Sequence, residues 1–339
     1  MVNFTFACGS ETVDVSFRVM DAILVAGAGA LGSVVGGLLA RHGLPVTLLG
    51  RAPHLQTVRT RGLKIEGLFG NHHVPGVRCA FAVSELHPPY ATILLTVKSY
   101  DTTTMLAAVA PLLAPKGAVL VMQNGLGNLE AAAAAVGTER VLGARVIFGA
   151  ELAAPGVARV TVCADPVLVG SPDPADHGRQ AMAAEWASIF EAAGMPCAPT
   201  STLVPELWAK ALYNAALNPL GALLGVPYGY LATDADLRMI MDAAIDEGFA
   251  VARADGITLR WPDAPAYRTE FYSRLVPATA GHRSSMLQDL ARGRPTEIEA
   301  INGYFVRRGM ALGVPTPTNA VLTRLIRART RRARASEVL

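Results

Sequence analysis

Short apolar runs alternate with longer amphipathic or alanine-rich stretches through about the first 150 residues. The apolar runs have the length of strands buried on both faces, and the stretches between them are long enough for helices. Alternating strands and helices predict a doubly wound α/β fold, in which helices cover both faces of a parallel sheet. The expected strands lie at 23–26, 45–49, 92–97 and 118–122, and the expected helices at 30–42, 101–113 and 127–136.

The pattern changes after about residue 150. Two short apolar runs with β-branched residues fit a more antiparallel region, and almost everything after about residue 202 has the spacing of helices. The expected elements of the first region are strands at 157–162 and 166–169 and a helix at 179–193.

Prolines cluster at 195–203, where we place the domain boundary. We expect an α/β domain over 21–200 and an all-helical domain over 201–335. Residues 1–20 precede the first clear element, and the sequence leaves three interpretations open for this extension: an extra strand, a disordered arm or an over-extended start.

Three polar residues form a row on one otherwise apolar helix. Lys210, Asn214 and Asn218 are four residues apart, so they lie on one helix face. Buried without partners they would cost several kcal/mol, so we expect them to face water, a partner or a ligand. Pro219 has no backbone N–H and disfavours helical geometry before it, which predicts that the helix ends or kinks there.

Composition adds mainly exclusions. The chain is 51% hydrophobic and 17% charged, with a formal net charge of +3. Its arginine-rich segment 324–334 is interpreted as a solvated helix end, so no nucleic-acid partner is expected. The N-terminus lacks the pattern of a secretory signal, and asparagines and prolines interrupt the uncharged stretch 211–233, so no membrane span is expected. The sequence leaves the oligomeric state open, with a homodimer as one option.

The cysteines carry no metal-binding spacing. Cys8, Cys79, Cys163 and Cys197 are far apart and form no CxxC or Cys/His pattern. We therefore expect reduced thiols in a cytoplasmic protein without a metal site.

A glycine motif follows the first predicted strand and opens a helix. Gly27, Gly29 and Gly32, with Ala28, Ala30 and Leu31 between them, form G-x-G-x-x-G. In this context the glycines allow a tight turn and close approach of a pyrophosphate to the helix N-terminus. The sequence therefore predicts a Rossmann-like, dinucleotide-binding domain.

Arg51 favours NADP(H) as the cofactor. Sites that prefer NAD usually carry an acidic residue at the end of the second strand, whereas this strand ends with Gly50 and Arg51. A guanidinium suits a 2′-phosphate through its paired donors. Lys98 and Asn124 follow two further strands at the same sheet edge, so both are candidates to bind the cofactor or substrate.

With these motifs in order, the chain resembles the ketopantoate reductase (2-dehydropantoate 2-reductase) family over about residues 21–325. The resemblance rests on GAGALG at 27–32, Gly50-Arg51, VK at 97–98, QNG at 123–125, ELWAKALYNAALNPL at 206–220 and SSMLQDLARGRPTEIEAING at 284–303.

The resemblance implies an active site between the two domains, where NADPH reduces 2-dehydropantoate to D-pantoate in the route to pantothenate and coenzyme A. It implies that Lys210 is the general acid, that Asn214, Asn218 and Ser285 bind substrate, and that Asn124 lies between cofactor and substrate. It gives Glu297 a role at the catalytic centre and the cofactor.

Glu297 is also our candidate for the carboxylate that keeps Lys210 protonated. Burial on an apolar helix face lowers the pKa of a lysine, and a nearby carboxylate raises it. Thr296 and Glu299 have the spacing of a capping box, which leaves Glu297 free of that structural role. The alternative for Glu297 is favourable placement in the first turn of a helix.

Two departures bear on the substrate. Tyr228 stands where some family members carry an asparagine that contacts substrate, and residues 160–166 lack the glycine-containing stretch expected there. They motivate a second hypothesis, an NADP-dependent reductase of a different 2-oxo acid. A third hypothesis is an inactive NADP-binding sensor, although the lysine, serine and glutamate are all present.

Overall fold

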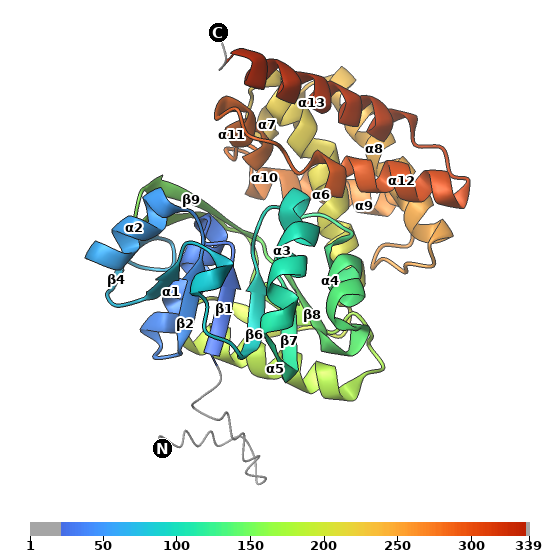
Figure 1. The fold of residues 1–339 in the computed structure, drawn as a ribbon. Helices are drawn as coiled ribbons and strands as arrows, with labels where there is room; N and C mark the ends of the chain where they lie inside the picture. The colour runs from blue at the N-terminus through green and yellow to red at the C-terminus, as the bar shows by residue number, and fades with distance from the viewer. Residues whose placement is uncertain (1–21, 337–339) are drawn as a thin grey trace.

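The computed structural model describes residues 22–336, with side chains described to residue 332. The three interpretations of the extension over 1–20 concern residues outside this range. A strand-rich part comes first along the chain, and helices alone make up the part that begins with α6 (Figure 1).

The main sheet has eight strands in the order β12-β11-β8-β7-β6-β1-β2-β5. Neighbouring strands are parallel except β8 and β11. The predicted doubly wound sheet is confirmed, although β6 and β7 begin earlier than expected. The strand bounds are β1 Ala22–Ala26, β2 Val46–Leu49, β5 Arg78–Ala80, β6 Tyr90–Leu95, β7 Leu113–Val121, β8 Val141–Arg145, β11 Val167–Gly170 and β12 Cys197–Pro199.

Helices cover both faces of this sheet (Figure 1). Alternate residues of β1 show why its run is continuously apolar: Ile23 and Val25 enter the core on one face, and Leu24 and Ala26 enter the core on the other. The helices of this part are α1 Ala30–Arg41, α2 Ala52–Arg61, α3 Thr102–Val109, α4 Asn128–Val136 and α5 His177–Ala192.

A second, four-stranded sheet packs against α1. Its strand β10 covers the predicted strand 157–162 and pairs antiparallel with β9, as expected for this region, and parallel with β3. The bounds are β3 Leu63–Gly67, β4 His72–Val74, β9 Phe148–Ala154 and β10 Val157–Cys163.

The helical part packs around α6. Its core contains the buried side chains of Leu212, Leu217, Tyr267, Phe271 and Phe305. No helix in the described range 22–336 is long and apolar enough to cross a membrane. The helices are α6 Leu203–Leu224, α7 Tyr228–Thr233, α8 Ala235–Ala254, α9 Ala264–Glu270, α10 Val276–Ala278, α11 Ser285–Ala291, α12 Asn302–Leu312 and α13 Pro317–Ser336, with a π-helical turn at Phe271–Leu275 and a 3₁₀ turn, η6, at Ile298–Ala300.

The predicted end or kink at Pro219 is wrong as a helix end, because α6 continues to Leu224. Pro219 cannot donate to the carbonyl of Ala215, the bond that an ordinary residue would make there. The side-chain amide of Asn302 donates to that carbonyl instead, at 3.0 Å. A long-range side-chain contact therefore replaces the missing backbone bond and lets the helix continue.

Hydrogen bonds of His54 join α2 to α1 and to the turn between β9 and β10. The backbone N–H of Gly156 donates to His54 Nδ1 at 3.0 Å, so Nε2 carries the proton toward the Ser33 hydroxyl at 2.9 Å. Burial lowers the pKa of His54 below its ordinary value of 6.5. The folded state therefore favours neutral histidine, and this contribution to stability is lost as pH falls below about 6.5.

Replacing His54 with leucine leaves the buried N–H of Gly156 without an acceptor, so we expect it to destabilise the protein by about 1–3 kcal/mol at pH 8. The variant should also lose less stability than the wild type between pH 8 and pH 5.5. Urea unfolding at the two pH values measures both effects. The exposed His42 provides a control, because His42→Gln should leave the pH dependence as it is. Equal pH dependence in wild type and His54→Leu would contradict the assignment.

Candidate active site

The turn after β1 has the shape of a phosphate-binding loop. Gly27 has a φ of +118°, and a side chain on it would collide with the backbone of Val97, 2.5 Å from its nitrogen. A Cβ on Gly32 would lie 2.2 Å from the carbonyl oxygen of Gly27. A Cβ on Gly29, in contrast, would meet nothing within 4 Å. Two glycines therefore close the turn, and the third leaves open space at the start of α1.

The residues around this space fit a pyrophosphate. The first-turn amides of α1, from Ala30 and Leu31 onward, have no intrahelical acceptors, and the first turn carries no acidic residue. Ala28, the one other residue of the motif, is buried and donates its N–H to Leu49 at 2.8 Å.

Arg51 lies exposed beside this loop, directly before α2. Its guanidinium makes no ion pair with any side chain in the described residues. A Cβ on Gly50 would lie 2.9 Å from the Cβ of Ala28, so the end of β2 approaches the glycine loop closely. A free cation next to a phosphate-binding loop is suited to a second phosphate.

Lys98 bridges the two parts of the molecule. Its ammonium lies 2.7 Å from Asp289 Oδ2 and 3.4 Å from Glu297 Oε2, both on the helical part. Burial alone would lower the pKa of Lys98, but Glu297 and Asp289 outweigh burial and raise it. Glu297 Oε1 also accepts the backbone N–H of Ser99 at 3.0 Å. The loop after β6 is therefore held to the helical part by charged hydrogen bonds.

Lys210 crosses the same junction in the opposite direction. Its ammonium donates to Asn124 Oδ1 at 2.6 Å and to the backbone carbonyl of Val146. Both acceptors belong to the strand-rich part, at the ends of β7 and β8. The lysine of the polar row on α6 therefore finds partners, in the loop that we expected to hold cofactor and substrate.

Burial lowers the pKa of Lys210 from 10.5 to about 8, Glu297 raises it, and Arg145 lowers it further. The expected opposition between burial and Glu297 is therefore present. Glu297 acts at longer range than expected, since its direct partners are Lys98 and Ser99 and not Lys210. An ammonium with a pKa near 8 can donate a proton at neutral pH.

The two asparagines of the row differ in their partners. Asn214 is 9% exposed, and its amide makes no hydrogen bond with the described residues. Asn218 accepts a hydrogen bond at Oδ1 from the hydroxyl of Tyr228. Burial raises the pKa of Tyr228, which keeps the phenol neutral and a donor. The bond orients the Asn218 amide so that its Nδ2 remains available to an acceptor.

Tyr228 also belongs to a small aromatic cluster. Its ring meets Tyr213 at 6.0 Å and His282 at 5.3 Å between centroids, both edge to face. The residue that departs from the family pattern therefore lies in contact with the polar row and adds aromatic surface beside it.

Ser285 is the first residue of α11, but Ser284 is its cap. The Ser284 hydroxyl accepts the N–H of Leu287 at 3.0 Å, whereas the Ser285 hydroxyl makes no hydrogen bond with the described residues. Helix capping therefore does not account for Ser285.

The predicted capping box at 296–299 is wrong. Among the residues that the structure describes, the buried Thr296 hydroxyl has no hydrogen-bond partner, and Glu299 binds Arg327 at 2.6 Å and Arg307 at 3.3 Å. The segment forms only the 3₁₀ turn η6, and α12 starts at Asn302, beyond the reach of such a cap.

The loop 123–128 is fixed by Gln123 and Gly125, which the sequence analysis named only as parts of the QNG motif, and by Asn128, which it missed. Gln123 donates from Nε2 to the carbonyl of Val97 at 2.8 Å, and Asn128 donates to the carbonyl of Asn124 at 3.0 Å. Gly125 has a φ of +84°, and a Cβ on it would lie 2.5 Å from the carbonyl oxygen of Ala300. Only glycine permits this approach.

The sequence analysis also missed three residues that contact the two lysines or shift their pKa values: Asp289, Arg145 and Val146. Asp289 could have been found within the motif 284–303.

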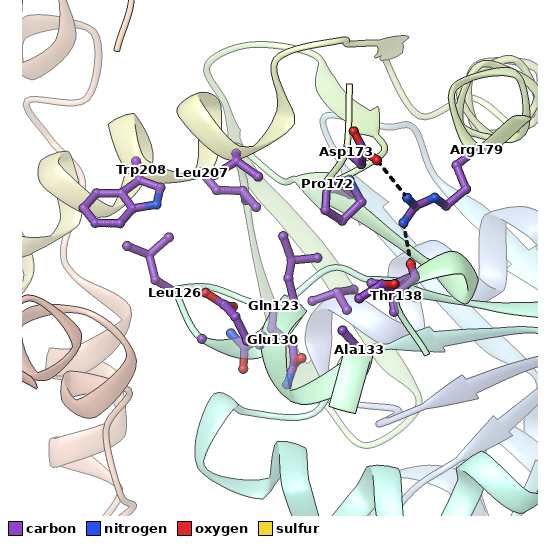
Figure 2. Close-up of a pocket in the computed structure, with 18 residues that line it drawn as sticks. Gln123, Leu126, Glu130, Ala133, Thr138, Pro172, Asp173, Arg179, Leu207 and Trp208 are labelled. Carbon is purple, nitrogen blue, oxygen red and sulfur yellow. Dashed lines mark hydrogen bonds and ion pairs between the residues drawn. The ribbon is translucent and has the colours of Figure 1, made fainter. Parts of the chain in front are cut away.

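A further cavity of about 450 Å³ lies beside this loop. Figure 2 shows the side chains that line it. Gln123, Leu126, Leu207 and Trp208 line it, and Arg179 closes its far side through bonds to Asp173 and Thr138. Its lining residues do not include Asn124 or the row on α6. None of the candidate catalytic or substrate-binding residues therefore lines this cavity.

Comparison with known proteins covers nearly the whole described chain. Residues 23–174 match the family model described as ketopantoate reductase PanE/ApbA, and residues 202–330 match its C-terminal model. The 2-dehydropantoate 2-reductase of Aquifex aeolicus is 37% identical over 90% of this chain and 96% of its own. That of Pyrococcus horikoshii is 33% identical over 91% and 97%.

Solved structures give the same picture. A PanE/ApbA family ketopantoate reductase from Ralstonia eutropha JMP134 superposes with a TM-score of 0.81 at 35% identity, covering 92% of this chain and 99% of its own. A D-mandelate dehydrogenase solved with NADH and anilino(oxo)acetate superposes with a TM-score of 0.83 at 27% identity, with the same coverage.

The chain contains only four lysines, so the pKa of Lys210 can be measured directly by NMR of protein labelled with ¹³C-lysine. We expect one resonance to titrate near pH 8 and to vanish in Lys210→Ala. Glu297→Gln removes a negative charge that favours the ammonium, so it should lower this pKa further.

Glu299→Gln is the matched control, because Glu299 is paired with two arginines on the surface and should leave the resonance unchanged. An unshifted Lys210 titration in Glu297→Gln would show that Glu297 does not control the lysine.

Proposed function

We propose that this chain, which belongs to the ketopantoate reductase family and is an oxidoreductase acting on CH–OH groups, reduces 2-dehydropantoate to D-pantoate with NADPH. The observation that carries the proposal is the contact between Lys210 and Asn124 at 2.6 Å. It brings the one cation of the α6 row to the loop after β7, at the sheet edge where a doubly wound fold binds its cofactor.

In the proposed reaction, the nicotinamide cofactor that the glycine loop would hold would supply the hydride for the keto carbon. The electron pair of the C=O bond moves to oxygen, and Lys210 stabilises the growing charge and then transfers a proton from Nζ to it. Two acceptors hold the ammonium, so its orientation is set before substrate arrives. The pKa of about 8 leaves Lys210 largely protonated at neutral pH, and the rate should fall as pH rises above that value.

The substrate carboxylate would bind among Asn214, Asn218 and Ser285. Asn214 and Ser285 have no hydrogen-bond partner in the described residues, and Asn218 keeps its Nδ2 available. All three side chains are neutral donors, and a 2-keto acid needs such donors for its carboxylate in addition to the group that protonates its keto oxygen. Glu297 serves by holding Lys98 and Ser99 and by supporting the charge of Lys210.

For the cofactor, Gly27–Gly32 would hold the pyrophosphate and Arg51 the 2′-phosphate of NADPH. The absence of an acidic residue at the end of β2 and the unpaired guanidinium of Arg51 support this choice. Lys98 and Asn124 border the same loops and are proposed as further contacts.

A second candidate function is the reduction of another 2-oxo acid. The aromatic cluster of Tyr213, Tyr228 and His282 lies beside Asn218, and the D-mandelate dehydrogenase neighbour has an aromatic substrate by its name. An aromatic 2-oxo acid would match such a surface.

We also propose a cytoplasmic location. Cys79, Cys163 and Cys197 are all free thiols in the described residues, which is the ordinary state of cysteines in a reducing compartment.

Purified protein should oxidise NADPH with ketopantoate faster than with other branched or aromatic 2-oxo acids such as phenylglyoxylate. Lys210→Ala should lower kcat by about 10²–10⁴-fold, the usual contribution of a general acid. Preferred turnover of phenylglyoxylate would favour the second function. A near wild-type rate in Lys210→Ala would refute the general-acid role, and no turnover of any keto acid would favour the inactive sensor.

Arg51→Ala should raise KM for NADPH by about tenfold or more through loss of a charged hydrogen bond to the 2′-phosphate. KM for NADH should change little, since NADH has no such phosphate. Arg61, an exposed arginine at the other end of α2, gives the control Arg61→Ala, which should keep the wild-type preference. A wild-type enzyme that prefers NADH would contradict the assignment outright.

A further inference from the structure

We propose that Asn302 is a positioning residue for substrate binding: its side-chain amide replaces the backbone hydrogen bond that Pro219 removes from α6, and thereby fixes the turn that carries Asn214 and Asn218. This inference rests on the proposed function for the role of the two asparagines.

The replacement follows from the geometry of one buried turn. Pro219 has no N–H, so the carbonyl of Ala215 cannot receive the helical bond from position 219. Asn302 Nδ2 lies 3.0 Å from that carbonyl oxygen. Ala215, Pro219 and Asn302 are all buried, with Asn302 at 0% exposure, so water cannot supply the donor. A buried carbonyl without a donor is costly, which gives Asn302 a defined role.

Asn302 is itself held in place by a chain of buried bonds. Its Nδ2 also donates to Asn319 Oδ1 at 2.9 Å. Asn319 Nδ2 donates to the carbonyl of Ala244 at 3.1 Å and to Glu247 Oε2 at 2.7 Å. The carboxylate of Glu247 in turn accepts the backbone N–H of Asn319 at 2.9 Å. The bonds run from α6 through α12 and α13 to α8, so the helical part as a whole fixes this amide.

The missing backbone hydrogen bond lies next to the residues that are proposed to bind substrate. The missing bond would join Ala215 to Pro219, the residues directly after Asn214 and Asn218, which are the two asparagines proposed to bind substrate. Lys210 lies one turn earlier, and its ammonium is held separately by Asn124 and Val146. Loosening the turn at Ala215 should therefore displace the substrate-binding amides more than the proton donor.

A double-mutant cycle tests the proposal. Asn302→Ala should raise KM for the keto acid by about tenfold, the loss expected for one buried hydrogen bond, with a smaller change in kcat and none in KM for NADPH. Pro219→Ala restores an N–H that can donate to Ala215, so it should behave nearly as wild type. In that background Asn302→Ala should raise KM much less.

Tyr272→Phe is the matched control, because it removes a hydrogen bond of the helical part, from the Tyr272 hydroxyl to Asp242 at 2.7 Å, that involves neither Asn302 nor α6. It should lower stability without a comparable rise in KM. If Asn302→Ala does not fold alone, Asn302→Ser is measured in both backgrounds with the same expectations.

If Asn302→Ala raises KM and lowers stability equally in the wild-type and Pro219→Ala backgrounds, Asn302 does not replace the missing backbone bond. Lost stability with an unchanged KM would overturn the positioning role. Urea unfolding measures the coupling free energy between positions 219 and 302 and needs no enzyme assay. If that coupling is absent, this inference is refuted even if no keto acid is turned over. Failure of the wild type to turn over keto acids would instead refute the proposed function.

Discussion

A buried ammonium group is the constraint on which the arrangement depends. The one carboxylate of α6, Glu206, lies four residues before Lys210 but pairs with Arg145 at 3.1 Å, so Lys210 must find oxygen atoms elsewhere. It finds them in the strand-rich part, at Asn124 and Val146. Lys98 makes the reverse connection to Asp289 and Glu297. Each part of the molecule thus supplies a cation that pairs with oxygen atoms of the other part, and these reciprocal pairs define the junction where the chemistry is proposed to occur.

The sequence was most informative where a local pattern had one physical solution. The run at 23–26 is apolar on both faces because helices cover both faces of β1, and the glycines at 27 and 32 have no room for a side chain. The spacing of Lys210, Asn214 and Asn218 likewise required a shared helix face. The strand order, the second sheet and short strands such as β5 and β12 carry weaker local signals, since they depend on pairing between distant segments.

The errors had a common cause, which was a distant partner. Local rules end a helix at Pro219, but Asn302 lies far along the chain and supplies the missing donor. Local rules cap a helix with Thr296 and Glu299, but Arg327 and Arg307 bind the glutamate instead. Asp289 was overlooked because its partner, Lys98, lies on another domain. Within the site, residue types could be anticipated, whereas which residue pairs with which required the fold.

The two acceptors of Lys210 have a consequence for stereochemistry. An ammonium has three hydrogens, and the bonds to Asn124 and Val146 take two of them, which leaves one direction for the third. Under the proposed function, a keto oxygen lies along that direction, and the carboxylate lies toward Asn214 and Ser285. A planar group fixed at these two points turns one of its faces toward the edge of the sheet, where a bound nicotinamide would supply the hydride. The handedness of the product alcohol would then be set by a lysine held on two sides.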